Sequence, residues 1–150
     1  MYNLDVVGND NFFVGEKGWL VHNAKNGCLV VVDGYTVGRH GSMPTPRLGV
    51  AESHHGTMSQ WMRSQFGSRY NPNDAPAVLM DIADHNKTRG LYNTWRADIT
   101  RANGGRFDWS NVSERQIRDL GDRMFEVAKV PDAVRVEYWV QFSTLQRSLK

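Results

Sequence analysis

Three of the five histidines of this 150-residue chain fall in one stretch, from Glu52 to Gly90. His54 and His55 are adjacent near its start, and His85 lies near its end. An imidazole titrates near neutral pH and can either accept a proton or bind a metal ion. Consecutive residues of an extended segment point to opposite sides, so one histidine of the pair could face a metal ion while its neighbour faces a water molecule.

The chemistry that suits this set is hydrolysis of a phosphodiester bond. The reaction needs a base that deprotonates the attacking water, positive charge at the phosphate and a stabilised leaving oxygen. One histidine can be the base, and a divalent metal ion held by few protein ligands can supply the rest. A second interpretation stays open on the residues alone, that of ordinary core and surface histidines, because the spacing matches no strict zinc motif.

An amphipathic helix is predicted directly after the histidine pair. Its apolar residues recur at i, i+3, i+4 and i+8, the spacing of one helix face, and they are Met58, Trp61, Met62 and Phe66. Thr57 is expected near the N-cap and Gly67 at the end of this helix. Residues 68–76 then form a turn-rich connection.

The third histidine is expected beside the start of a second helix. A short apolar run at residues 78–80 predicts a strand or the lead-in to a helix that begins near Asp81 or Asp84. That helix is expected to end at the glycine pair 104–105. His85 would then close the candidate site from the side opposite the pair.

Before this stretch the sequence predicts two short strands and a loop. The runs 28–32 and 35–37 are rich in β-branched residues and are separated by the turn pair 33–34. Residues 38–49 are rich in glycine and proline and are expected to form an exposed loop. His40 lies in it, either as an outer ligand or phosphate contact or, more in keeping with a loop, as a solvated histidine.

The tail is expected to be helical and to carry no chemistry. A capping box from Ser113 to Gln116 precedes one apolar helical pattern, and Pro131 opens another. The aromatic residues of this tail recur at helical spacing and are expected to pack in the core.

Composition indicates one soluble globular domain. A single cysteine excludes an internal disulfide and a cysteine-based zinc site, and no apolar run reaches the ~18–20 residues of a membrane span. The net charge is +2, and arginine is the main base in the middle of the chain. Arginine binds phosphate in a bidentate fork, so this suits a polyanion, although a solvated arginine-rich surface explains the charge equally well.

Residues 1–24, MYNLDVVGNDNFFVGEKGWLVHNA, predict a small hairpin-like unit. They resemble the C-terminal end of a Hint (hedgehog/intein) autoprocessing domain. The resemblance implies that Asn23 cyclises and cleaves the following bond, that His22 assists by protonation, and that Ala24, which is no nucleophile, permits no ligation. It divides the chain into a Hint remnant, residues 1–23, and an effector domain, residues 24–150, as in bacterial polymorphic toxins.

The segments ESHHG, YNPNDAPAVLM and DHNKTRG of the effector part resemble the HNH nuclease toxins that are named for a Ser-His-His signature. These belong to the ββα-metal nuclease superfamily. The resemblance implies an α+β, mainly helical fold, with a ββα-metal core and a C-terminal helical extension. Carried over by position, it implies that His54 and His85 bind the metal ion and that His55 is the general base.

The chain departs from the broader superfamily pattern at two positions. Pro76 or a neighbour stands where the middle asparagine is usual, and Asn71 or Asn73 is expected to take over its structural role. Arg89 stands where some relatives have a further histidine, and it could contact the phosphate or the leaving group, or form a surface salt bridge. With two imidazole ligands and open positions, one divalent ion is expected, and Mg, Mn, Ni and Zn all remain possible.

The residues and the resemblance together predict a metal-dependent endonuclease toxin, and the resemblance alone implies that it is a DNase. It would be secreted as the tip of a larger protein, act in the cytoplasm of a target bacterium, use no membrane contact and be neutralised by a cognate immunity protein. An RNase on the same scaffold is one alternative. A non-catalytic binding module that histidines and a metal ion stabilise is another, and a chain that works only as a processing fragment is a third.

Overall fold

The computed structural model describes residues 11–14, 19–22, 29–44 and 50–150. Strands β1 (Asn11–Val14) and β2 (Trp19–His22) pair antiparallel, in agreement with the hairpin predicted for the start of the chain. His22 ends β2, and Asn23 lies outside the described residues, so the processing junction stays a prediction.

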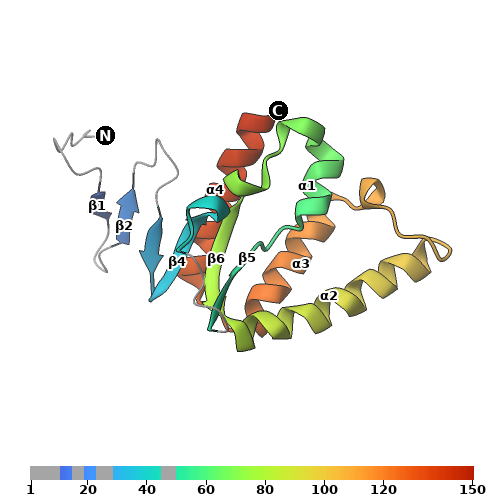
Figure 1. Ribbon diagram of the computed structural model, residues 1–150, viewed down its shortest axis with the longest axis horizontal. Coiled ribbons are helices and arrows are strands. Elements are labelled where there is room, and N and C mark those ends of the chain that lie inside the picture. Colours follow the sequence, from blue (N-terminus) through green and yellow to red (C-terminus); the bar gives the residue numbers. More distant parts are fainter. Residues whose placement is uncertain (1–10, 15–18, 23–28, 45–49) are drawn as a thin grey trace.

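A four-stranded antiparallel sheet carries the rest of the fold (Figure 1). In spatial order its strands are β3 (Val30–Val32), β4 (Tyr35–Arg39), β6 (Pro76–Asp81) and β5 (Ala51–His54). Asp33 and Gly34 form the two-residue turn between β3 and β4, with φ of 47° and 81°. Two left-handed residues in succession match the twist of a tight hairpin, and the predicted turn is confirmed.

Strand β4 is longer than the sequence predicts. Gly38 and Arg39 were expected in an exposed loop, but they pair with Ala77 and Pro76 of β6 and continue the strand. The segment His40–Ser42 then forms a 3-10 turn, η1. The loop prediction is therefore wrong for this part of the chain, because pairing with a distant strand outweighs the local glycine content.

Helix α1 (Ser59–Phe66) lies in the connection between β5 and β6 and ends at Gly67, as predicted. Thr57 is not its cap, since Met58 holds the N-cap position without a capping side-chain bond. Instead Thr57 is buried, and its backbone N–H donates to the hydroxyl of Tyr138 over 2.8 Å. This bond fastens the segment after the histidine pair to the interior of the protein.

The connection continues through two 3-10 turns, η2 (Gly67–Arg69) and η3 (Pro72–Asp74). Helix α2 (Ile82–Ala102) then begins directly after β6, with Asp81 at its N-cap. Figure 1 shows α2 beginning at the lower end of β6 and extending past α3. The predicted helix start is confirmed, and a left-handed glycine pair, Gly104 and Gly105, follows the last turn.

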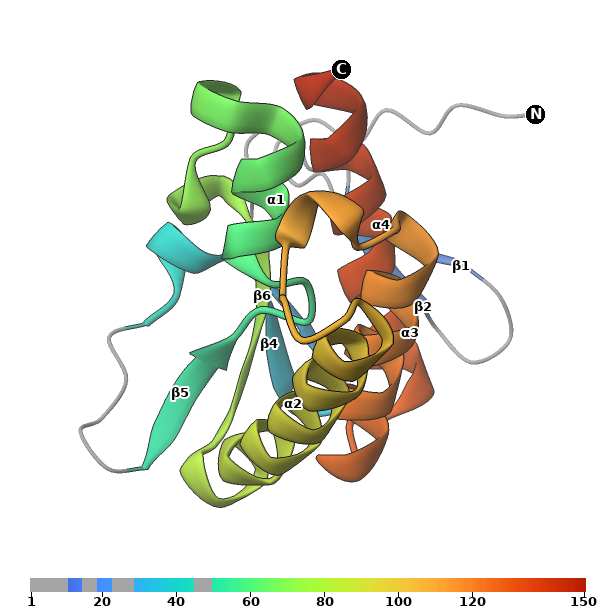
Figure 2. The same ribbon diagram turned by 90° about the vertical axis from the view of Figure 1, so that its right-hand side faces the viewer.

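Helix α3 (Glu114–Val127) follows a last 3-10 turn, η4 (Trp109–Asn111), and α4 (Asp132–Leu149) completes the chain. The capping box of Ser113 and Gln116 is present as predicted. Figure 2 shows α3 and α4 on the same side of the sheet. Helix α4 packs on β4 and β6, and α3 packs on α2. The largest fully buried side chains of α3 and α4 are Phe125, Tyr138 and Phe142.

The architecture is α+β, with more helix than strand. In the part of the chain that the structure describes, no helix combines the length and the apolar character needed to cross a bilayer.

Candidate functional site

His54 is the last residue of β5 and is almost completely buried, with 4% of its surface exposed. Its ring meets the ring of His85 edge to face, with centroids 5.1 Å apart, and packs on Phe125 from α3 at 5.8 Å. His55 follows directly, and its ring lies 4.4 Å from that of His40. The two neighbouring rings therefore have different partners, as expected for successive residues of an extended segment.

His85 reaches this site because of the way β6 continues into α2. β5 and β6 are antiparallel, with His54 beside Val78 and Ala51 beside Asp81, so α2 begins from the strand next to β5. Residue 85 lies in the first turn of α2, beside the end of β5. The structure thus brings together all three histidines that the sequence singles out.

Each of these three rings has one buried nitrogen that makes no regular hydrogen bond, and the one on His85 contacts the carboxylate of Glu52. They are Nε2 of His54, Nδ1 of His55 and Nδ1 of His85. Buried polar atoms are nearly always hydrogen-bonded, and leaving one unpaired costs about 1–3 kcal/mol. The two nitrogens of His54 and His55 that have no partner at all indicate a site at which a ligand or a metal ion binds.

Burial also keeps the imidazoles of His54 and His55 neutral. It lowers the pKa of His54 to about 3, and the proximity of His85 and His55 adds to the shift. Burial likewise lowers the pKa of His55 to about 4, helped by His40 and opposed by the backbone carbonyl of Pro76. At neutral pH both rings therefore hold a free lone pair, which binding a cation or accepting a proton requires.

The donor set fits a divalent cation. Nε2 of His54 has no hydrogen-bond partner, Nδ1 of His85 contacts the carboxylate of Glu52, and the two rings meet edge to face. Neutral imidazole is a common ligand of Zn, Ni and Mn ions. No set of three His, Cys, Asp or Glu side chains is gathered for an ion within the described ranges. Two protein donors would leave positions open for phosphate and water.

Glu52 is a site residue that the sequence analysis misses. Its Oε2 forms an ion-pair contact with Nδ1 of His85, and it lies 3.9 Å from Nη2 of Arg89. Glu52 comes two residues before His54, so both side chains project from the same side of β5. This alternation along the strand was the signal in the sequence that could have identified Glu52. Its carboxylate adds negative charge beside the imidazoles.

His40 also belongs to the site, and the interpretation as a solvated loop histidine is wrong. Its Nδ1 lies 2.9 Å from the hydroxyl of Ser53, and its backbone N–H donates to the carbonyl of Ala75 over 2.8 Å. These bonds fix its ring against that of His55. The local sequence gave no indication of this, because the contact depends on how β4 and β5 lie relative to β6.

Asn71 and Asn73 lie further away and do not line the cavity at the histidines. The side chain of Asn71 accepts a hydrogen bond from the backbone N–H of Asn73 over 3.1 Å and so caps η3. Asn73 in turn packs against Gly41 of η1, where a Cβ at residue 41 would approach it to 2.8 Å. The two asparagines therefore support the segment that carries His40.

Beside the three histidines is a cavity of about 380 Å³ between α1 and α2. Arg89 lines it, and 65% of its side chain is exposed. The wall contains two arginines and three histidines and no aspartate or glutamate. This is the charge pattern of a site for an anion.

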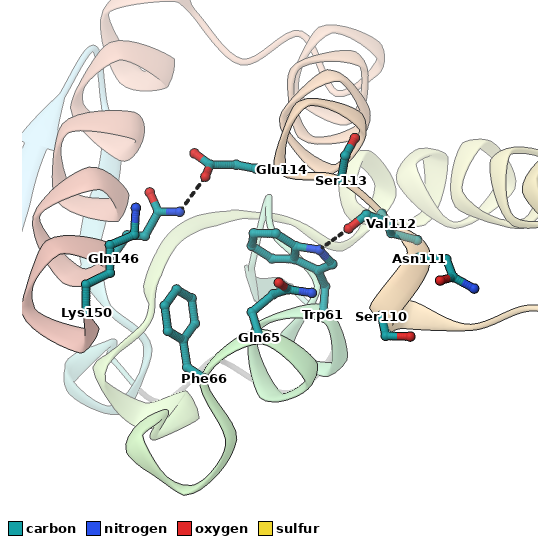
Figure 3. Close-up of a pocket in the computed structure, with 10 residues that line it drawn as sticks. All are labelled: Trp61, Gln65, Phe66, Ser110, Asn111, Val112, Ser113, Glu114, Gln146 and Lys150. Atoms are coloured by element: carbon teal, nitrogen blue, oxygen red, sulfur yellow. Dashed lines mark hydrogen bonds between the residues drawn. The ribbon is translucent and has the colours of Figure 1, made fainter.

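Figure 3 shows a second cavity, of about 430 Å³, between α1, the start of α3 and the end of α4. Two of its polar groups are already hydrogen-bonded: Nε2 of Gln146 donates to Glu114 over 2.7 Å, and the indole of Trp61 donates to the carbonyl of Val112 over 2.8 Å. No histidine lines it. It therefore lacks the open donors of the histidine site.

Two antiparallel strands that lead into a helix, with histidines at the strand end and in the first helical turn, define a small α+β domain with a histidine-based site. Residues 49–146 match the family described as HNH/Endo VII superfamily toxin with a SHH signature, and the chain belongs to this family. The Ser-His-His run of this chain is Ser53 to His55. Membership implies a nuclease, and hence a hydrolase, of the toxin class. None of the solved structures matches the chain.

Proposed function

We propose that this chain is a metal-dependent endonuclease toxin that hydrolyses phosphodiester bonds of DNA in competing bacteria. The observation that carries the proposal is the gathering of three imidazoles, those of His54, His55 and His85, in the wall of an anion-compatible cavity. Membership in an HNH/Endo VII toxin family supports the same reaction class.

His54 and His85 are the proposed metal ligands. Their rings meet edge to face, Nε2 of His54 has no hydrogen-bond partner, and Nδ1 of His85 contacts only the carboxylate of Glu52. The rest of the ion's coordination positions would stay open. When bound, a divalent ion supplies positive charge to the phosphate and to the leaving oxygen. Mg, Mn, Ni and Zn are all compatible with this role.

His55 is the proposed general base. Its ring is neutral at pH 7, so the unpartnered Nδ1 can take the proton of an attacking water. His40, held by Ser53, lies on the other side of the ring and limits how far it can rotate. Fixing the base in one orientation keeps it directed at the reacting water.

Arg89 is the proposed phosphate contact. Its guanidinium is exposed at the cavity, and its nearest carboxylate, Glu52, lies at 3.9 Å, a distance at which an exposed ion pair contributes little. The guanidinium therefore stays available for a bidentate bond to a phosphate or leaving oxygen.

The toxin class and the Hint-like start of the chain support a setting for this activity. In it, residues 1–23 are a processing remnant, and residues 24–150 are the effector of a larger secreted protein that acts in the target cytoplasm. A cognate immunity protein would protect the producer. An acidic surface on that protein would complement the arginines of the effector.

The proposal is tested by incubating the purified chain with supercoiled plasmid, and separately with total RNA, in Mg, Mn, Ni, Zn or EDTA. Nicking and linearisation of the plasmid with a metal ion, and none in EDTA, support a DNase. Degradation of RNA but not of the plasmid would mean that the substrate is RNA and not DNA. A chain that is stabilised by metal against thermal unfolding but cuts neither would be a binding module, and the proposal would be wrong.

A further inference from the structure

The cavity beside the histidines extends well beyond the groups needed to cut a phosphodiester. Its far part is lined by Met58 from the N-cap of α1, Tyr92 and Arg96 from α2, and Met124 from α3. His85, Arg89, Tyr92 and Arg96 follow one another at i, i+4, i+7 and i+11, so they lie along one side of α2. They span about 16 Å along the helix axis. The cavity is thus a tract with an imidazole end and an aromatic, apolar end.

The aromatic end is held in place by packing. The ring of Tyr92 stacks on that of Trp95, with centroids 6.3 Å apart and an interplanar angle of 28°. Trp95 itself is buried against Phe107 and Trp109. A ring fixed in this way has lost its conformational freedom before anything binds, which favours stacking by a planar ligand.

The charged groups of the tract are available to an anion. The guanidinium of Arg96 lies over the ring of Phe107 at 5.0 Å, and among the described residues no carboxylate lies within ion-pair distance of it. Arg89 has only its distant contact with Glu52. A planar, apolar slot flanked by two free guanidiniums has the chemistry of a nucleotide-binding site, in which an aromatic ring stacks on the base and arginine binds the phosphate.

We infer that this tract binds an unpaired nucleotide next to the phosphate that is cut, with its base stacked on Tyr92 and a flanking phosphate on Arg96. This inference rests on the proposed function for the position of the scissile phosphate at the histidines. A base inside a duplex must first leave its stack, which opposes binding, whereas a base of a single strand is already free. The chain is therefore selective for single-stranded or locally melted nucleic acid.

The test measures binding, not cutting. The full chain in EDTA is titrated into a fluorescein-labelled single-stranded oligonucleotide and into its blunt duplex at one stated salt concentration. Single-strand binding at least about 10-fold tighter than duplex binding is expected. Tyr92→Ala weakens single-strand binding by about 10-fold or more, the effect of losing one stacked base, while Tyr92→Phe and the neighbouring Asn93→Ala on α2 retain it. Arg96→Gln weakens binding and reduces its salt dependence, whereas the exposed Arg101→Gln on the same helix changes neither.

A second measurement uses only the parent protein, so it does not depend on whether a variant folds. An oligonucleotide that carries the fluorescent base 2-aminopurine is expected to lose fluorescence on binding as a single strand, because the base stacks on a tyrosine. Equal affinity for single strand and duplex, or 2-aminopurine fluorescence that is unchanged on binding, would overturn the inference. Stacking in a chain that cuts nothing with any metal would refute the nuclease and leave the nucleotide tract in place.

Discussion

The rings of His54 and His85 lie edge to face with centroids 5.1 Å apart, although one ends strand β5 and the other lies in the first turn of α2. Two features of the backbone produce this contact: β5 pairs with β6, and β6 runs into α2 without a loop. Nε2 of His54 has no hydrogen-bond partner, and Nδ1 of His85 contacts the carboxylate of Glu52. The fold thus brings together the two imidazoles that are proposed to hold the metal ion.

This arrangement predicts how metal affinity depends on each histidine. Replacing His54 or His85 by alanine is expected to weaken divalent metal binding by at least about 10-fold, since the loss of even an outer-shell partner has an effect of that size. His55→Ala is the matched control, because the base is not a ligand and its loss leaves affinity within about 2-fold. Isothermal titration calorimetry with Zn and Mn measures all three. Equal affinities in the four proteins would contradict the assignment of the ligands.

The buried neutral histidines predict a pH dependence of stability in the metal-free protein. The pKa values of His54 and His55 are about 3 and 4 in the folded protein, against an ordinary value of 6.5. Over this range the unfolded chain binds protons that the folded chain does not, so stability is complete above pH 6.5 and is lost as the pH falls. By pH 5 each ring accounts for a loss of up to about 2 kcal/mol. Urea unfolding in EDTA at pH 7 and at pH 5 measures this loss of stability.

The His54→Asn variant is the control for that measurement. It removes one of the two groups, so the difference between pH 7 and pH 5 is expected to shrink by roughly half. An unchanged difference would mean that His54 is not held neutral by the fold.

Local patterns made much of this fold predictable. The capping box of α3, the Asp33–Gly34 turn and the start of α2 near Asp81 each depend on residues close together in sequence, and the structure confirms them. The position of His85 beside a helix start was predictable for the same reason. The sequence also predicted that this helix lies near the histidine pair, but only the pairing of the strands fixes how the three rings are placed.

Tertiary contacts decided what the sequence did not reveal. Thr57 is a buried partner of Tyr138 instead of a helix cap, and His40 packs on His55 instead of facing solvent. Both contacts join segments that are distant in the chain. Glu52 was missed for a different reason, because a lone carboxylate gives no signal until its strand alternation is known.

The close packing of the segment after His55 on α3 predicts a stability effect at Gly121. A Cβ there would meet the carbonyl oxygen of Gly56 at 2.7 Å, a backbone atom that has little room to move. Gly121→Ala is therefore expected to destabilise the protein by about 1–3 kcal/mol, as overpacking does. Thermal and urea unfolding measure the change.

Gly90→Ala on α2 is the matched control, because the space around residue 90 is open. It should instead stabilise the helix by up to about 1 kcal/mol, the propensity difference between alanine and glycine. A Gly121→Ala variant as stable as the parent would show that the segment does not pack on α3 in this way.

The exposure of Arg89 predicts that its role in cutting can be separated from stability. Arg89→Ala is expected to lower the cleavage rate by about 10-fold or more, the loss of one charge-assisted bond to phosphate. Because its ion pair with Glu52 is long and exposed, the melting temperature should change little. Arg89→Lys recovers only part of the rate, because lysine does not reproduce the bidentate fork.

Arg101→Ala, on an exposed position of the same helix, is the control for general loss of positive charge. If it lowers the rate as much as Arg89→Ala does, then Arg89 contributes only to overall charge and has no specific contact with the phosphate.

The central claim is that His55 takes a proton from water beside an ion held by His54 and His85. The most direct measurement is the rate of plasmid cleavage by His55→Ala and by the parent, at saturating metal and with metal binding checked in both. A rate about 10²–10⁴-fold lower in the variant, with its metal affinity and fold retained, is the expected result. A folded, metal-bound His55→Ala protein that cuts DNA at the parent's rate would contradict it.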